Sequence, residues 1–173
     1  MNKTLISTAL VAVVAAIGFA PTAQAAGGTI TISGKVLADT CVVAVNGGST
    51  VALPTVMTAA LNTVGSVAGA TNFSIGLTGC DTNTTSATMA FSGANINSTT
   101  GNLNNTAVSG SNVQVQLLNG ASVINTSNNA NAPVIAVAAG AGTASLKAQY
   151  IAATAAATPG LVSSTVNFTL TYL

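Results

Sequence analysis

The sequence predicts an all-β domain of the sandwich type. Three observations support this fold class. After an apolar leader, the chain consists of short stretches in which apolar and polar residues alternate at period two. Clusters of Gly, Asn, Ser and Thr separate these stretches, and no long segment keeps a helical period. Roughly seven or eight short strands with regular turn signals are typical of a β-sandwich.

The first 25 residues have the three parts of a secretory signal in the correct order. Lys3 supplies a positive charge, Leu5–Phe19 is an uncharged apolar run, and Ala23-Gln24-Ala25 is a small-residue cleavage site. The apolar run is shorter than the roughly 20 residues that cross a bilayer, and no positive stop-transfer cluster follows it. Residues 1–25 are therefore predicted to be a cleaved signal peptide.

The first strands are expected between Gly28 and Val56. Gly28–Leu37 alternates, with Ile30 and Ile32 on one face and Thr and Ser on the other. Cys41–Val45 is a compact β-rich run that ends at an Asn-Gly-Gly turn. Val51–Val56 is a candidate short strand, limited by its proline.

The later strands follow at regular spacing. Their alternating apolar residues are Phe73, Ile75 and Leu77; Ala87, Met89 and Phe91; Val113, Val115 and Leu117; Leu146, Ala148 and Tyr150; and Val166, Phe168, Leu170 and Tyr172. Met57–Val67 is the one helical candidate, sufficient for a turn or two. Ala152–Ala157 is rich in alanine but too short to hold a helix alone.

The chain after the signal carries almost no charge. Its only ionic side chains are Lys35, Lys147, Asp39 and Asp81, which balance to zero. A nucleic-acid-binding protein needs a basic face, which this composition does not provide. An uncharged, apolar-rich chain is also the opposite of a disordered one. Net charge near zero favours association between molecules.

The composition excludes most catalytic sites. With no histidine and two acidic residues, no Ser-His-Asp triad or histidine-ligated metal centre can be assembled. Ser145 and Lys147 lie two residues apart on a predicted strand, but such pairs are common and inert. We expect no enzyme activity, no metal and no cofactor.

Cys41 and Cys80 are the only two cysteines, in a chain predicted to be exported. In an oxidising compartment such a pair normally forms a disulfide. A metal site would lack ligands, and a redox pair usually has C-x-x-C spacing. The sequence therefore predicts a structural disulfide between them.

Several segments together resemble a known family. Gly27–Val36, the pairs Thr40-Cys41 and Gly79-Cys80, and the run from Lys147 to the penultimate Tyr172 are similar to the major pilins of chaperone–usher fimbriae, specifically the type 1-like subunits. The resemblance extends over the whole chain after the signal and is densest at its two ends.

This resemblance implies an incomplete immunoglobulin-like sandwich that lacks its final strand. A donor strand from a neighbouring subunit would complete it, which is a form of β-strand addition. The implied donor residues that enter the groove are Gly28, Ile30 and Ile32. The implied groove and chaperone-binding edge consists of Val166, Phe168, Leu170 and Tyr172. Two ordinary strands of a complete sandwich are the alternative interpretation of both ends.

The expected function is structural. The resemblance implies a fimbrial subunit that supports adhesion, with residues 26–35 as the donor extension and residues 36–173 as the pilin domain. Its partners would be identical neighbouring subunits in the polymer, with a periplasmic chaperone and an outer-membrane usher during export to the cell surface. A minor or tip adhesin that binds a surface ligand is the alternative.

Overall fold

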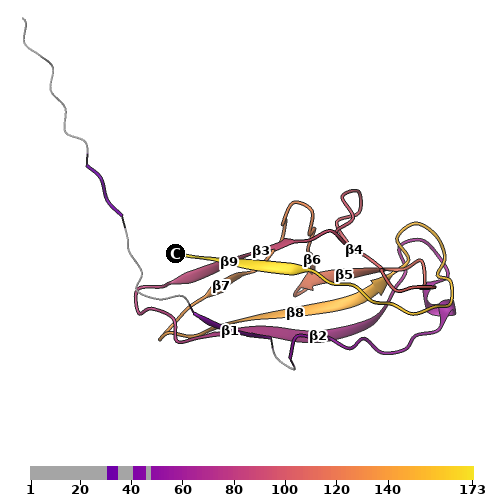
Figure 1. Ribbon diagram of the computed structural model, residues 1–173, viewed down its shortest axis with the longest axis horizontal. Coiled ribbons are helices and arrows are strands. Elements are labelled where there is room, and N and C mark those ends of the chain that lie inside the picture. The colour runs from indigo at the N-terminus through magenta and orange to yellow at the C-terminus, as the bar shows by residue number, and fades with distance from the viewer. Residues whose placement is uncertain (1–30, 35–40, 46–47) are drawn as a thin grey trace, which may run out of the picture. The chain divides into compact units, whose positions relative to one another are not determined.

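The strands form two sheets that pack face to face in the computed structural model, which describes residues 31–34, 41–45 and 48–173 (Figure 1). In the first sheet the order is β1 (Val42–Val45), β2 (Val67–Thr78), β8 (Gly142–Ile151), β5 (Gln114–Asn119) and β4 (Leu103–Asn104), with β6 (Ser122–Val123) also paired to β5. In the second sheet the order is β7 (Val134–Ala136), β3 (Ser86–Ser92) and β9 (Asn167–Tyr172). All strand pairs are antiparallel.

The core lies between the two sheets and is made by the inward residues of the alternating strands. Ile75 and Leu146 contribute from the first sheet, and Met89 and Ile135 from the second; each is at most 2% exposed. Each such side chain contributes about 1.5–3 kcal/mol when it leaves water. The period-two pattern thus sets which face of each strand points inward.

Most predicted strands are confirmed, with two differences in the first third of the chain. Val51–Val56 was expected as a short strand, and this is wrong: the segment is not in a strand, although Val51 and Leu53 pack against the core. Pro54 has no backbone N–H, so it cannot donate a hydrogen bond to a neighbouring strand. Of Gly28–Leu37, only Thr31–Gly34 is described, and it is not assigned to a strand.

The predicted helical turn is confirmed as a single 3-10 turn, η1 (Thr58–Leu61), whose Leu61 is buried. β2 begins soon afterwards at Val67, because β-branched residues and a glycine end the helical segment. Ala152–Ala157 forms no helix, as expected. No helix in the described ranges is long and apolar enough to cross a membrane.

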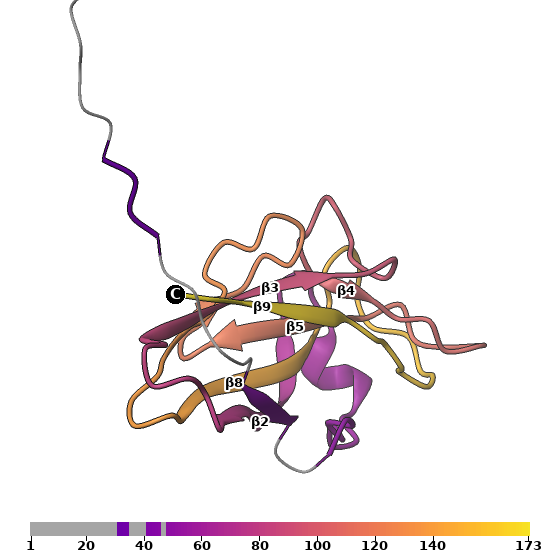
Figure 2. The same cartoon turned by 60° about the vertical axis from the view of Figure 1, so that its left-hand side comes forward.

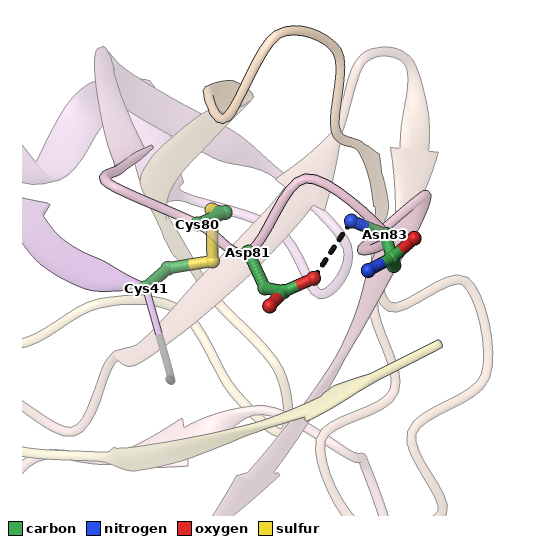
Figure 3. The surroundings of a disulfide bond; sticks show 4 residues. All are labelled: Cys41, Cys80, Asp81 and Asn83. Carbon is green, nitrogen blue, oxygen red and sulfur yellow. Dashed lines mark hydrogen bonds between the residues drawn. A yellow bond between two sulfur atoms is a disulfide. The ribbon is translucent and has the colours of Figure 1, made fainter. Parts of the chain in front are cut away.

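The disulfide between Cys41 and Cys80 is confirmed (Figure 3). It joins the residue before β1 to the residues that follow β2, and Val42 pairs with Thr78 in the adjacent ladder. Next to it, the Asp81 carboxylate accepts a hydrogen bond of 2.7 Å from the backbone N–H of Asn83 (Figure 3). The disulfide therefore fixes the edge strand β1 to the sheet.

A buried amide network lies on the other face of β5, and the sequence pattern did not predict it. Gln149 donates to Gln116 at 2.8 Å, Gln116 donates to Asn102 at 3.4 Å, and Asn102 donates to Gln114 at 3.1 Å. All four residues are at most 8% exposed. β5 is therefore buried on both faces, and the amide groups bond to one another because water does not reach them.

The disulfide generates the first prediction. Thiol titration of the denatured, unreduced protein should detect no free thiol. Reduction should lower the free energy of unfolding by about 4 kcal/mol, since the bond closes a loop with a sequence separation of 39. The control is the double variant Cys41→Ala, Cys80→Ala, whose free energy of unfolding should not change when reductant is added. Two titratable thiols in the unreduced wild type would contradict the assignment.

The amide network generates the second prediction. Gln116→Leu should lower the free energy of unfolding by about 2–4 kcal/mol, because it leaves the buried Gln149 and Asn102 amides without their partner. Thr88→Leu, at an exposed position of β3, is the control and should change stability by about 0.5 kcal/mol or less. Equal denaturation midpoints for the two variants would show that the network contributes nothing.

Candidate functional site

An apolar groove opens between the two sheets along the edge formed by β9. Its volume is about 600 Å3. One wall is formed by Val45 and residues 49–53, and the opposite wall by residues 162–166 and Phe168. β2, β5 and β8 supply the floor, which includes Phe73 and Tyr150. A packed protein interior has few voids larger than a water molecule, so a space of this size is an open groove rather than a packing defect.

The side chains along the groove are apolar but only half-buried. Val51, Leu53, Phe73, Val166 and Phe168 all pack against the core while remaining partly exposed. In a complete sandwich, such inward-facing side chains would be covered by another strand. The groove therefore presents a row of apolar side chains to any chain segment laid between its walls.

The backbone of β9 also has an open side. β9 pairs with β3 (Figure 2), and the described residues provide no second strand partner. In the segment before β9, the backbone carbonyl of Leu161 accepts a hydrogen bond from the N–H of Ser111, and that of Ser163 accepts one from the N–H of Thr106. Directly after β9, the N–H of Leu173 donates to the carbonyl of Ser86. Alternate residues of an antiparallel strand direct their backbone groups to opposite sides. The even-numbered residues from 162 to 172 therefore direct theirs towards the groove.

The same even-numbered residues direct their side chains inward. Burial alternates at every position from Leu161 to Leu173, with the even-numbered residues half-buried. Of the four predicted edge residues, Val166 and Phe168 line the groove. Leu170 and Tyr172 lie on the same face beyond the groove lining and pack against the core. The four predicted residues thus share one face, and two of them meet the groove directly.

The predicted donor residues are described only in part. Gly28 and Ile30 lie outside the described residues. Ile32 is 91% exposed, which leaves a large apolar side chain in water. The assignment of Gly28, Ile30 and Ile32 to a donor strand stays a prediction, as does the division of the chain at residues 25 and 35.

A second, smaller hollow of about 300 Å3 adjoins the groove and shares Tyr150 and Val162 with it. Burial raises the pKa of Tyr150 above its ordinary value, so the phenol is neutral at physiological pH. Gly69 lets the ring approach closely, because a Cβ at this position would lie 2.9 Å from the Tyr150 ring. Tyr150 thus lines both hollows, and its ring lies where a side chain at position 69 would collide with it.

Ser164 is a groove residue that the sequence pattern did not single out. It lines the groove between Val162 and Val166, and its hydroxyl is buried with no hydrogen-bond partner among the described residues. The sequence did contain a signal for this residue. Among the alternate residues from Val162 to Tyr172, Ser164 is the only polar one apart from the tyrosine. Tyr150 and Phe73 were missed as groove residues because they come from the opposite sheet.

The groove has no catalytic chemistry. In the described ranges, no group of His, Cys, Asp and Glu could hold a metal ion. Ser145 and Lys147 flank the inward Leu146 and therefore lie on the outer face of β8. The arrangement can bind an extended apolar strand through side chains and backbone together.

Comparisons with known proteins identify the family of the chain. The family model described as type-1 fimbrial protein, A (FimA) matches residues 53–173. The major fimbrial subunit SMF-1 of Stenotrophomonas maltophilia is 41% identical over 170 residues, covering 87% of this chain and 95% of that protein. The F17 fimbrial protein of Escherichia coli is 43% identical over 157 residues, covering 84% of this chain and 87% of that protein.

A solved structure extends the comparison to the fold. The P pilus rod subunit PapA superimposes with a TM-score of 0.63 at 18% identity, covering 78% of this chain and all of that chain. At this identity the match establishes the shared immunoglobulin-like pilin fold. The predicted resemblance to type 1-like fimbrial subunits is confirmed: the chain belongs to the type-1 fimbrial protein family, as a structural subunit of a fimbria and not an enzyme.

Proposed function

We propose that this subunit polymerises into a cell-surface fibre by donor-strand exchange. The N-terminal extension of one subunit enters the groove of the next and completes its sandwich. The single observation that carries the proposal is the groove itself: an apolar hollow of about 600 Å3 beside a strand with an open backbone edge.

The apolar part of the interaction comes from matching side chains. Gly28, Ile30 and Ile32 share one face of an extended strand, as residues two apart do. The groove offers Val166 and Phe168 on one wall and Leu53 on the other. Moving two isoleucines from water into this space contributes about 3–6 kcal/mol. The exposure of Ile32 in the single subunit supports a role for this side chain in a partner's groove.

The backbone part of the interaction comes from β9. The N–H and C=O groups of its even-numbered residues face the groove, so an added strand extends the ladder that β9 already forms with β3. Each such hydrogen bond contributes about 0.5–1.5 kcal/mol net. The added strand would place Thr29 and Thr31, which alternate with the isoleucines, on its outer side.

The same exposed features require protection before assembly. A bare groove with an open strand edge is an aggregation hazard. We therefore propose that a periplasmic chaperone fills the groove first and contacts the edge formed by Val166, Phe168, Leu170 and Tyr172. An outer-membrane usher would then pass the subunit to the growing fibre. The predicted signal at residues 1–25 supports this route.

A shaft subunit is favoured over a tip adhesin. The curated relatives cover nearly the whole chain, and one of them is named a major fimbrial subunit. The pilin domain, residues 36–173, accounts for nearly all of the chain after the signal.

The donor face generates a third prediction. Ile30→Asp and Ile32→Asp should each abolish fibres while chaperone-bound subunit persists, because a carboxylate would have to enter an apolar groove without a partner. Thr31→Asp, on the outer side of the same strand, is the matched control and should assemble. The measurement is fibre yield by electron microscopy with periplasmic subunit levels in parallel. Equal yields from the three variants would refute the assigned faces.

The incomplete fold generates a fourth prediction. A subunit trimmed of residues 26–33 should melt far lower alone than with a saturating peptide of that sequence. The gain should be about 10 °C or more, since each kcal/mol moves the midpoint by about 2–4 °C at this size. Immobilising the peptide offsets part of the burial. A peptide carrying Ile30→Asp and Ile32→Asp is the control. Identical melts with and without the native peptide would indicate a complete sandwich.

A further inference from the structure

A further hollow, which we call the polar hollow, lies on the outer face of the first sheet, on the opposite side of that sheet from the groove. Its volume is about 570 Å3. Its floor is formed at Phe73 and Leu146, whose own side chains face the core. The turn between β5 and β6, at Gly120 and Ala121, forms one side. The outward residues that line it are all polar: Asn72, Ser74, Ser145 and Lys147.

The four polar side chains lie close together because β2 and β8 are directly paired. Asn72 lies opposite Lys147 in this ladder. Ser74, two residues further along β2, lies opposite Ser145. Side chains directly opposite in an antiparallel pair have Cβ atoms about 4.5–5.5 Å apart, and residues two positions apart on a strand are about 7 Å apart. One amide, two hydroxyls and one ammonium group can therefore contact the same small ligand.

These side chains are available to a ligand. None of the four forms a side-chain hydrogen bond or an ion pair with another residue in the part of the chain that the structure describes. Many polar side chains elsewhere on the surface do bond to nearby groups; Asn105 and Asn112, for example, both donate to backbone carbonyls. The donors and acceptors of the polar hollow therefore face solvent, where a bound molecule can replace water.

The polar hollow also has a local positive charge. Lys147 is the only cationic side chain in the described ranges, and Asp81, the only acidic side chain there, follows the end of β2. Ser74 and that end, at Thr78, are about 13 Å apart along the strand, which exceeds the screening length of about 8–10 Å at ordinary salt concentrations. No acidic side chain among the described residues therefore neutralises Lys147.

We propose that the polar hollow binds an acidic sugar unit of an anionic polysaccharide. The Lys147 ammonium pairs with a carboxylate or sulfate group, and the hydroxyl and amide groups beside it bond to sugar hydroxyls. The volume is in the range of small-ligand sites, about 300–1,000 Å3. A nucleic acid is a poor match, because a chain without arginine and with one cation at the site cannot follow a phosphate backbone.

Repetition makes such a weak site effective. A single exposed ion pair changes an affinity by a factor of about five or less. A fibre carries one polar hollow in every subunit, and a polysaccharide repeats its acidic unit, so several pairs form at once and strengthen one another through effective concentration. This gain requires only that the subunits polymerise, whichever segment joins them.

The test uses intact fibres purified from cells and two immobilised probes, alginate, which carries carboxylates, and heparin, which carries sulfates. Wild-type fibres should bind at least one probe at low salt and be released at about 1 M salt, where the screening length falls to about 3 Å. Lys147→Gln should weaken this binding about tenfold or more, because the lost ion pair is multiplied over several subunits. Lys147→Arg keeps the charge and should retain binding.

A matched variant separates the site from the net charge of the fibre. Lys147→Gln combined with Thr88→Lys moves the cation to an exposed position of β3, on the other sheet, and should not regain binding. Dextran, which is uncharged, should not retain the wild-type fibres. Ser74→Ala should weaken binding several-fold, an effect that charge attraction alone would not produce.

Recovery of binding in the variant with the relocated cation, or equal retention on dextran, would overturn the assigned site. Wild-type fibres that bind neither acidic polymer would also overturn it. If Lys147→Gln lowered the yield or heat resistance of the fibres and left polysaccharide binding unchanged, the polar hollow would be a contact with a second copy of the subunit, and the proposal would be wrong.

Discussion

The apolar row that runs from Val162 to Tyr172 lies along an edge that the described chain does not cover, and the other features of the molecule are arranged around it. Its even-numbered residues direct both side chains and backbone groups towards the groove. A strand in this state leaves part of its hydrophobic surface and the hydrogen-bonding groups of one edge unsatisfied within one subunit. Polymerisation through this edge would satisfy both needs at once, which couples folding to assembly.

A sandwich with an open groove needs other sources of rigidity, and the structure has two. The disulfide between Cys41 and Cys80 anchors β1, the strand that precedes one wall of the groove. The amide network around Gln116 buries the second face of β5 behind the groove floor. Both restraints lie next to the groove lining, since β1 contributes Val45 and β5 contributes Val115 and Leu117.

The scarcity of charged side chains is also consistent with a subunit that polymerises. A long fibre brings identical surfaces close together, and a subunit with balanced charge does not repel its copies. The polar surface is instead built from neutral Asn, Ser and Thr, whose side chains bond to nearby backbone; Asn105, for example, contacts both Ser111 and Leu161. These contacts hold the segment before β9 beside the rest of the sheet.

The sequence by itself determined the fold class, the longer strands and the disulfide, but it did not reveal the short strands β4, β6 and β7. Period-two alternation identifies an inward face wherever a strand is covered on one side only, so the residues of β2, β3, β8 and β9 were assigned correctly. It failed at Val51–Val56, where packing against the core does not require a strand ladder.

Only the tertiary structure revealed the groove as a cavity, because its walls come from segments far apart in the chain. It also decided that Gln114 and Gln116 are buried, since their cover is supplied by Asn102 and its neighbours in another segment. The tertiary structure likewise revealed that the Ser164 hydroxyl is buried with no hydrogen-bond partner among the described residues. Alternation records which face a side chain lies on, whereas only packing determines what, if anything, lies opposite it.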